Sequence, residues 1–142
     1  MLELGQGYLR ESGLETRIEL RRGYLPNAGL EAHAFDAVVA NSLLHHLAEP
    51  ADLWRTVRRC ARPGSPVMVV DLIRPDGPKE AHALVERYAQ RGHPRVKQDL
   101  FNSLCAAYTV EDVRGQLDEA GLAQMQVEAI NELQLKVWGL SN

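Results

Sequence analysis

Short apolar runs alternate with amphipathic stretches along most of this chain. The clearest run is Pro66–Leu72 (PVMVVDL), and an earlier one, Phe35–Ala40 (FDAVVA), is likewise mostly apolar and bounded by polar residues. Runs of this kind are typical of strands buried on both faces of a parallel sheet. A shorter segment, Thr16–Leu20, alternates apolar and polar residues and predicts a further strand.

Helical periodicity fills the intervals between these strands. The stretch Pro50–Ala61 carries apolar residues on one stripe and is stopped by Pro63-Gly64. Thr109 begins another helix, because Asp112 three residues later nearly completes a capping box, and Gly121 ends it. The predicted helices therefore span 1–11, 50–61, 79–90 and 109–120, while the residues from 91 to 107 form a loose segment and a short apolar stretch.

The C-terminus predicts two more strands, Gln124–Ile130 and Leu133–Trp138. Only Asn131-Glu132 joins them, which is too short for a crossover helix, so the two strands should be antiparallel. The expected fold is a single α/β domain over 1–142: an incomplete Rossmann-like doubly wound sheet, mainly parallel, with a C-terminal antiparallel hairpin.

The composition argues against a nucleic-acid-binding protein and against a membrane protein. The 142 residues are 45% hydrophobic and 25% charged, and the net charge of −3 argues against a nucleic-acid partner. No apolar stretch is long enough to span a bilayer, and no signal pattern opens the chain, so we expect a cytoplasmic protein without a membrane partner. Cys60 and Cys105 lack metal-ligand spacing and are expected to be buried thiols.

The segment FDAVVANSLLHHLAEPADLWRTVRRCARPGSPVMVVDLIRP, from Phe35 to Pro75, resembles the fourth and fifth strands of class I S-adenosylmethionine-dependent methyltransferases. The resemblance is strongest to the ubiquinone/menaquinone-biosynthesis type. Ser65 replaces the second glycine of the family's Arg-Pro-Gly-Gly loop, and the later segment NSLCAAYTVEDVRGQLDEAGL is similar to the approach to the sixth strand. The matching positions are Phe35, Asp36, Val38, His45, His46, Leu47, Pro50, Pro63, Gly64, Asp71 and Leu72.

The resemblance implies S-adenosylmethionine as the cofactor, the sheet order 3-2-1-4-5-7-6 with strand 7 antiparallel, and an acceptor lid over 74–108. The residues that it places at the cofactor are Met1, Tyr24, Leu25, Asn41, Ser42 and His46. Asn41 and Ser42 also fit a capped turn leading into the next helix. Either histidine of the pair His45-His46 can face the substrate or pack at the start of a helix, and adjacent histidines cannot both face one metal ion.

Three features by which the family binds its cofactor are missing from the residues: the glycine-rich turn after a first strand, the acid that ends a second strand and holds the ribose hydroxyls, and the acid that binds the adenine. Gly5 and Gly7 (LELGQGYL) have no apolar strand before them, so they do not form a glycine-rich phosphate or dinucleotide turn. Tyr24 follows Gly23 where the family commonly has an acid that binds the adenine, and a phenol cannot supply that charged acceptor. We therefore expect that the chain as given binds the cofactor poorly.

Three readings of function remain open. The chain belongs to an active methyltransferase whose N-terminal portion is absent from it, or it is a non-enzymatic remnant that acts as an oligomeric binding module. A nicotinamide-dependent Rossmann enzyme is the third, and it needs the same absent glycine loop. The residues assign no catalytic group, and they leave the acceptor open among a small molecule, a quinone precursor and a macromolecule.

Without the family's first two strands, Phe35–Ala40 becomes an exposed apolar edge, and such an edge is a template for pairing. We expect a homodimer through this strand, a domain swap, or the strand Thr16–Leu20 moving beside it.

Overall fold

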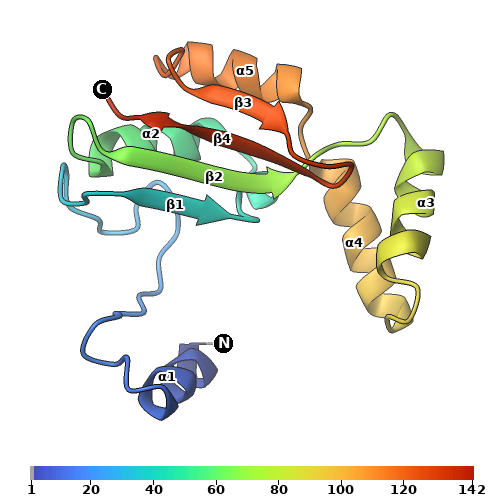
Figure 1. Cartoon of the computed structure of the whole chain (residues 1–142), viewed down its shortest axis with the longest axis horizontal. Helices are drawn as coiled ribbons and strands as arrows, with labels where there is room; N and C mark the ends of the chain where they lie inside the picture. The colour runs from blue at the N-terminus through green and yellow to red at the C-terminus, as the bar shows by residue number, and fades with distance from the viewer. Residues whose placement is uncertain (1) are drawn as a thin grey trace. The chain divides into compact units, whose positions relative to one another are not determined.

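The computed structural model describes residues 2–142, which divide into two compact units at Leu30 (Figure 1). The first unit contains helix α1 (Leu2–Glu11), a turn and an irregular segment, and none of its described residues is buried. The predicted strand Thr16–Leu20 is wrong: these residues close a turn and continue without strand pairing. A strand needs a neighbour for its backbone groups, and the described residues of this unit include no second strand.

The second unit, residues 31–142, is built on a four-stranded sheet in the order β1-β2-β4-β3 (Figure 1). Strand β1 pairs in parallel with β2, and β4 is antiparallel to both β2 and β3. This arrangement confirms the α/β class and the C-terminal antiparallel hairpin, and it matches the 4-5-7-6 half of the expected order. The strands are β1 (Val38–Asn41), β2 (Pro66–Leu72), β3 (Gln126–Ala129) and β4 (Gln134–Leu140).

One face of the sheet is covered by α2 (Ala51–Cys60) and α5 (Val110–Glu119), in agreement with the predicted helices. Trp54 is the largest fully buried side chain there, and its Nε1–H donates to Oε1 of Gln116 across 3.0 Å. The same face of the strands supplies the rest of this core, including Val67, Val69, Leu135 and Val137. The opposite face is open: Val39, Met68 and Leu140 are 64%, 41% and 59% exposed.

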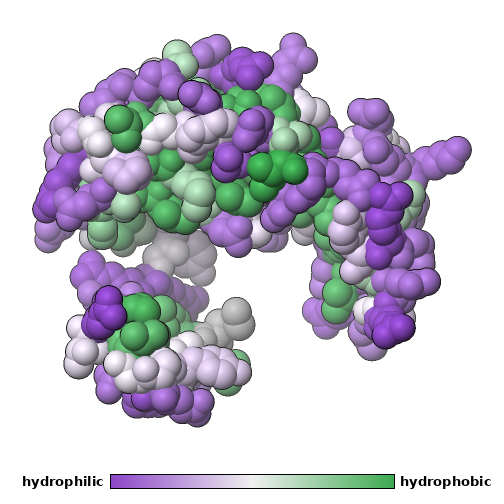
Figure 2. Space-filling model, viewed as in Figure 1, coloured by the Kyte–Doolittle hydropathy of each residue, from purple (hydrophilic) through white to green (hydrophobic). Residues whose placement is uncertain are grey.

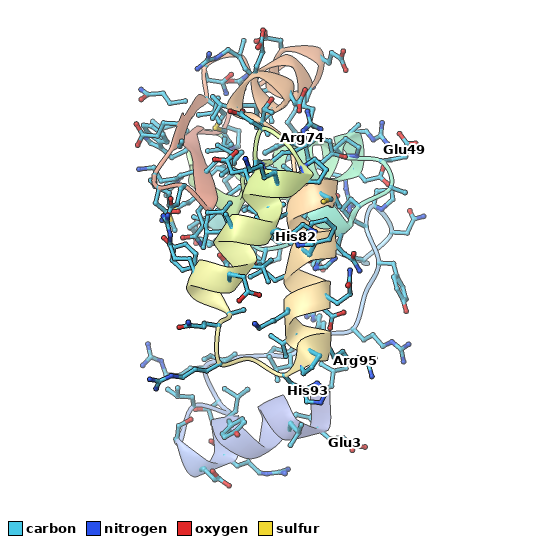
Figure 3. All side chains as sticks on the ribbon, turned by 90° about the vertical axis from the view of Figure 1, so that its right-hand side faces the viewer. Glu3, Glu49, Arg74, His82, His93 and Arg95 are labelled. Carbon is cyan, nitrogen blue, oxygen red and sulfur yellow. The ribbon has the colours of Figure 1, made fainter. Side chains whose placement is uncertain are left out.

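Two further helices, α3 (Pro78–Tyr88) and α4 (Pro94–Ala106), form a hairpin beyond the end of β2 (Figures 1 and 3). The helix over 94–106 was not predicted, although Pro94 at its first turn and His93, whose Nδ1 accepts from Arg95 N–H, form a recognisable start. The hairpin has its own small core of Ala81, Leu84, Val85 and Leu104. Cys105 is exposed on α4, contrary to expectation, whereas Cys60 is buried.

The hairpin is also tied to the turn between β3 and β4. Nη1 of Arg87 lies 2.6 Å from each carboxylate oxygen of Glu132, and the Tyr88 hydroxyl donates to Oε1 across 2.6 Å. The Tyr88 hydroxyl and then the Arg87 guanidinium hold the pKa of Glu132 below its ordinary value.

The capping box at the start of α5 is complete, as the sequence indicates. Thr109 Oγ1 accepts from Asp112 N–H at 3.1 Å, and Asp112 Oδ2 accepts from Thr109 N–H at 3.0 Å. We predict that Thr109→Ala lowers the free energy of unfolding by about 1 kcal/mol. Urea titration at neutral pH measures this change, and an unchanged midpoint would contradict the role of the cap.

The cap should also depend on pH. The Thr109 backbone N–H, more than the Thr109 hydroxyl and Arg74, holds the pKa of Asp112 below its ordinary value. A depressed folded-state pKa means that the carboxylate stabilises the fold above the unfolded-state pKa, and that this contribution is lost as pH falls through the folded value. The difference between wild type and Asp112→Asn should therefore shrink below about pH 4.

Candidate functional site

The carboxyl ends of β1 and β2 lie at the same edge of the sheet because the two strands are parallel. Asn41 closes β1, and Ser42 follows with a positive φ of 50° that turns the chain away from the sheet. The Ser42 N–H still donates to Val70 O across 2.9 Å, so the turn begins at the strand end. In open α/β sheets, ligands bind in the crevice outside this edge.

Asp71, the penultimate residue of β2, organises the turn. Its side chain is buried, with 2% exposed. Oδ2 accepts from the backbone N–H groups of Leu43 and Leu44 at 2.8 and 2.7 Å, and Oδ1 accepts from its neighbour Leu72 N–H at 2.8 Å. One carboxylate therefore holds the start of the 3-10 helix η1 (Leu44–His46) against the end of β2.

Oδ1 of Asp71 also lies 2.6 Å from Nδ1 of His45, whose side chain is 4% exposed. In the neutral imidazole this contact places the proton on Nδ1, so that Nε2 carries the free lone pair. Within residues 2–142 no group forms a hydrogen bond to His45 Nε2. A carboxylate-oriented imidazole of this kind can accept a proton from a bound hydroxyl or amine.

His46 is the exposed member of the histidine pair. Its ring centroid lies 3.9 Å from that of His45, with the planes tilted by 42°. The two rings therefore have different roles in the fold: His45 is committed to Asp71, and His46 faces solvent beside it.

The hairpin of α3 and α4 leaves and re-enters the fold beside this turn. Ile73 and Tyr108 form a parallel bridge, and Arg74 N–H donates to Tyr108 O across 3.1 Å. Helix α4 also contacts η1, and Leu104 on α4 is fully buried. Figure 3 shows Arg74 at the root of the hairpin and His82 further along α3, where its ring stacks on Phe101 at 4.3 Å.

Of the predicted cofactor residues, the structure brings together Asn41, Ser42 and His46 at the edge described above. Tyr24, which is 74% exposed, and Leu25 belong to the first unit, and Met1 lies outside the described residues. Sequence reasoning missed the pairing of Asp71 with His45. Two features of the sequence could have indicated this pair. Asp71 stands at the end of the predicted strand Pro66–Leu72, and His45 comes shortly after the predicted strand Phe35–Ala40, which is its parallel neighbour in the sheet.

The chain is similar to known methyltransferases both in sequence and in fold. A family described as the methyltransferase domain matches residues 1–69. Solved structures match nearly the whole chain: a SAM-dependent methyltransferase from Aquifex aeolicus has a TM-score of 0.63, with 16% identity over 94% of this chain. The fold is that of a class I methyltransferase. A search of curated proteins gives no match.

Two other structures extend this likeness to the methyltransferase fold. A putative methyltransferase from Bacillus halodurans has a TM-score of 0.62 and 19% identity over 90% of this chain. PigF, solved with SAH, has a TM-score of 0.66 and 15% identity over 96% of it. The chain covers 60%, 50% and 39% of these three structures respectively.

The described residues match only part of what an S-adenosylmethionine site requires. Asn41, Ser42 and His46 offer polar groups at the strand ends, where such a ligand lies. Gly5 and Gly7, however, lie within α1 and form no turn after a strand, and Tyr24 offers a phenol in place of a carboxylate. The polar groups that residues 2–142 place at the strand ends therefore fit part of such a ligand, and the described residues include neither a glycine turn after a strand nor an acid at position 24.

Other site types have less support. The structure holds no group of three or more metal-ligating side chains among residues 2–142. In the same residues, no helix combines the length and apolar character needed to cross a membrane.

Proposed function

We propose that this chain is the acceptor-side part of a class I S-adenosylmethionine-dependent methyltransferase of the ubiquinone/menaquinone-biosynthesis type. The observation that carries the proposal is the buried Asp71–His45 pair at the carboxyl ends of β1 and β2, beside the α3–α4 hairpin. The family match over residues 1–69 and the fold support it.

In this role the residues of the chain position an acceptor and receive its proton. Asp71 holds η1 and orients the His45 ring, and His45 Nε2 accepts the proton of an acceptor hydroxyl or amine. The hairpin over 74–108 serves as the acceptor lid, which excludes water and aligns the acceptor with the methyl donor.

We further propose that the chain by itself binds the cofactor poorly, because the glycine turn and the adenine-binding acid are missing from residues 2–142. Calorimetric titration with S-adenosylhomocysteine is expected to give no binding tighter than about 1 mM. Micromolar binding would overturn this part of the proposal and would indicate a site completed in another way. A full-length solved relative that binds the same ligand serves as the positive control.

A second candidate is a non-enzymatic module that keeps the fold and assembles into oligomers. The open apolar sheet face around Val39, Met68 and Leu140 favours it. One experiment distinguishes the two candidate functions: the chain is mixed with a polypeptide that carries the glycine turn, and binding of S-adenosylhomocysteine is measured. Recovered binding supports the methyltransferase. An oligomer that does not bind S-adenosylhomocysteine supports the non-enzymatic module.

A further inference from the structure

The imidazole ring of His45 is covered except near one atom. The side chains of His45 and Asp71 are 4% and 2% exposed, and the ring meets the carboxylate through Nδ1. Among residues 2–142, no buried side-chain nitrogen or oxygen lacks a hydrogen-bond partner. Nε2 of His45 has no partner, so it is the nitrogen of the ring that reaches the surface. A buried polar pair that opens at a single nitrogen points to a ligand group that binds there.

Asp71 decides which kind of ligand group can bind at this nitrogen. Its two oxygens accept from three backbone N–H groups and from the ring, namely those of Leu43, Leu44, Leu72 and His45. Because the neutral ring donates its Nδ1–H to the carboxylate, its Nε2 is an acceptor. The ligand therefore has to supply a hydrogen-bond donor, which excludes an ether oxygen and a carboxylate.

The charges around the ring argue against a positively charged ligand group. The run 37–48 (AVVANSLLHHLA), which contains β1 and η1, has no acidic residue, and the next acid, Glu49, lines a cavity between α2 and α5. The oxygens of Asp71 are already occupied. Charged side chains that the hairpin brings to this edge are paired with opposite charges, as in Arg74–Asp112 and Arg87–Glu132. In the space-filling view, apolar residues show over the strands and hydrophilic residues over the hairpin (Figure 2).

Methyl transfer distinguishes a hydroxyl from a neutral amine. An amine attacks with its lone pair and becomes a stable ammonium ion, so it needs no base in the same step. A hydroxyl that gained a methyl group and kept its proton would become a strongly acidic oxonium ion, so a base has to take the proton as the C–O bond forms. The Asp71–His45 pair supplies such a base at the carboxyl ends of β1 and β2.

We propose that the methyl acceptor presents an un-ionised hydroxyl group to His45 Nε2 and leaves as a methyl ether. This acceptor class rests on the proposed function. The hydroxyl oxygen forms a bond to the methyl carbon, the bond from that carbon to the sulfonium sulfur breaks, and its electron pair returns to sulfur. The hydroxyl proton moves to Nε2. The positive charge lost at sulfur is gained by the imidazolium, which faces the Asp71 carboxylate.

Binding of small probes to the His45 ring tests this acceptor class without a cofactor. Phenol, anisole, aniline and benzoate, which share one ring and differ in one group, are titrated into the purified chain while NMR follows the imidazole nitrogens. Phenol should shift the Nε2 resonance of His45 saturably and bind about 10-fold tighter than anisole, which lacks the donor. Aniline or benzoate that binds as tightly as phenol overturns the hydroxyl class, and so does an Nε2 resonance that phenol leaves unshifted.

Two variants locate the binding. His45→Gln should bind phenol and anisole equally, because it removes the ring, while its amide can still donate to Asp71. His33→Asn is the control and should keep the preference for phenol: this exposed histidine precedes β1 at the opposite end of the strand, and asparagine tolerates its positive φ of 51°. Amide spectra check that both variants are folded. A preference for phenol that survives in His45→Gln overturns the proposal.

The hydroxyl class and the proposed function fail in different ways. If the polypeptide with the glycine turn restores S-adenosylhomocysteine binding but phenol does not bind at His45, the methyltransferase stands and the hydroxyl acceptor is wrong. If phenol binds at His45 and S-adenosylhomocysteine binding is never restored, the ring binds hydroxyl compounds, but the transfer of a methyl group to them is wrong.

Discussion

Asp71→Asn is expected to lower the free energy of unfolding by about 3–5 kcal/mol, because the carboxylate is buried and accepts from several donors at once. An asparagine keeps one acceptor oxygen and turns an NH₂ group toward donors. Either the N–H groups of Leu43 and Leu44, or those of His45 and Leu72, then lose their acceptor. Chemical denaturation of the variant and wild type measures the loss.

The substitution should first loosen the turn after β1, while the rest of the sheet stays folded. Amide hydrogen exchange at Leu43 and Leu44 should accelerate in Asp71→Asn even under conditions where the sheet remains folded. Asp36→Asn is a matched control, since this acid is 82% exposed and pairs with Arg62 at the surface, where loss of the pair should cost less than about 1 kcal/mol. Equal losses for the two variants would contradict the organising role of Asp71.

The second large effect is expected for Trp54→Ala, which should cost about 3–5 kcal/mol through the cavity that it leaves. Trp54 is 1% exposed and donates from α2 to Gln116 on α5, so its removal takes away both this hydrogen bond and a large buried side chain on the covered face. Trp54→Phe should lose less, because it keeps most of the apolar volume and gives up only the bond to Gln116.

Trp138→Ala is the control that removes a tryptophan side chain from a site that is not fully buried. Trp138 lies on the open face, partly exposed, with Nζ of Lys136 4.2 Å from its ring centroid. Its truncation should cost markedly less than that of Trp54, and thermal unfolding monitored by circular dichroism compares the two. A larger loss at Trp138 would mean that the open face is already packed in solution.

The sheet could be predicted from the sequence because its signals are local. PVMVVDL is apolar enough to require burial, and the two-residue joint Asn131-Glu132 leaves only an antiparallel hairpin. The helix over 94–106 was missed because Gly92 precedes it and Pro94 begins it, and because its apolar residues pack mainly on α3. The strand at Thr16–Leu20 failed because alternation alone cannot supply a pairing partner.

The candidate site was predicted only in part, for a related reason. The sequence indicates that Asn41 and Ser42 lie at the end of a strand, and the structure places them at the carboxyl edge of the sheet, outside which open α/β sheets bind their ligands. It does not reveal that Asp71, 26 residues from His45, points at it, because that contact depends on the parallel pairing of β1 with β2. Long-range pairs of this kind arise from topology, which residue patterns constrain only indirectly.

The bridge between Ile73 and Tyr108 places the entry and the exit of the α3–α4 hairpin side by side, and the contacts of Arg87 and Tyr88 with Glu132 tie the hairpin to the β3–β4 turn as well. Because the two ends lie side by side, a longer or shorter hairpin need not alter the register of any strand of the sheet. The small core of the hairpin continues into the sheet, because Leu72 of β2 and Leu133 pack against it, so a changed hairpin has to keep this contact. Under the proposed function, exchange of residues 74–108 between methyltransferases tests whether this hairpin sets the acceptor preference.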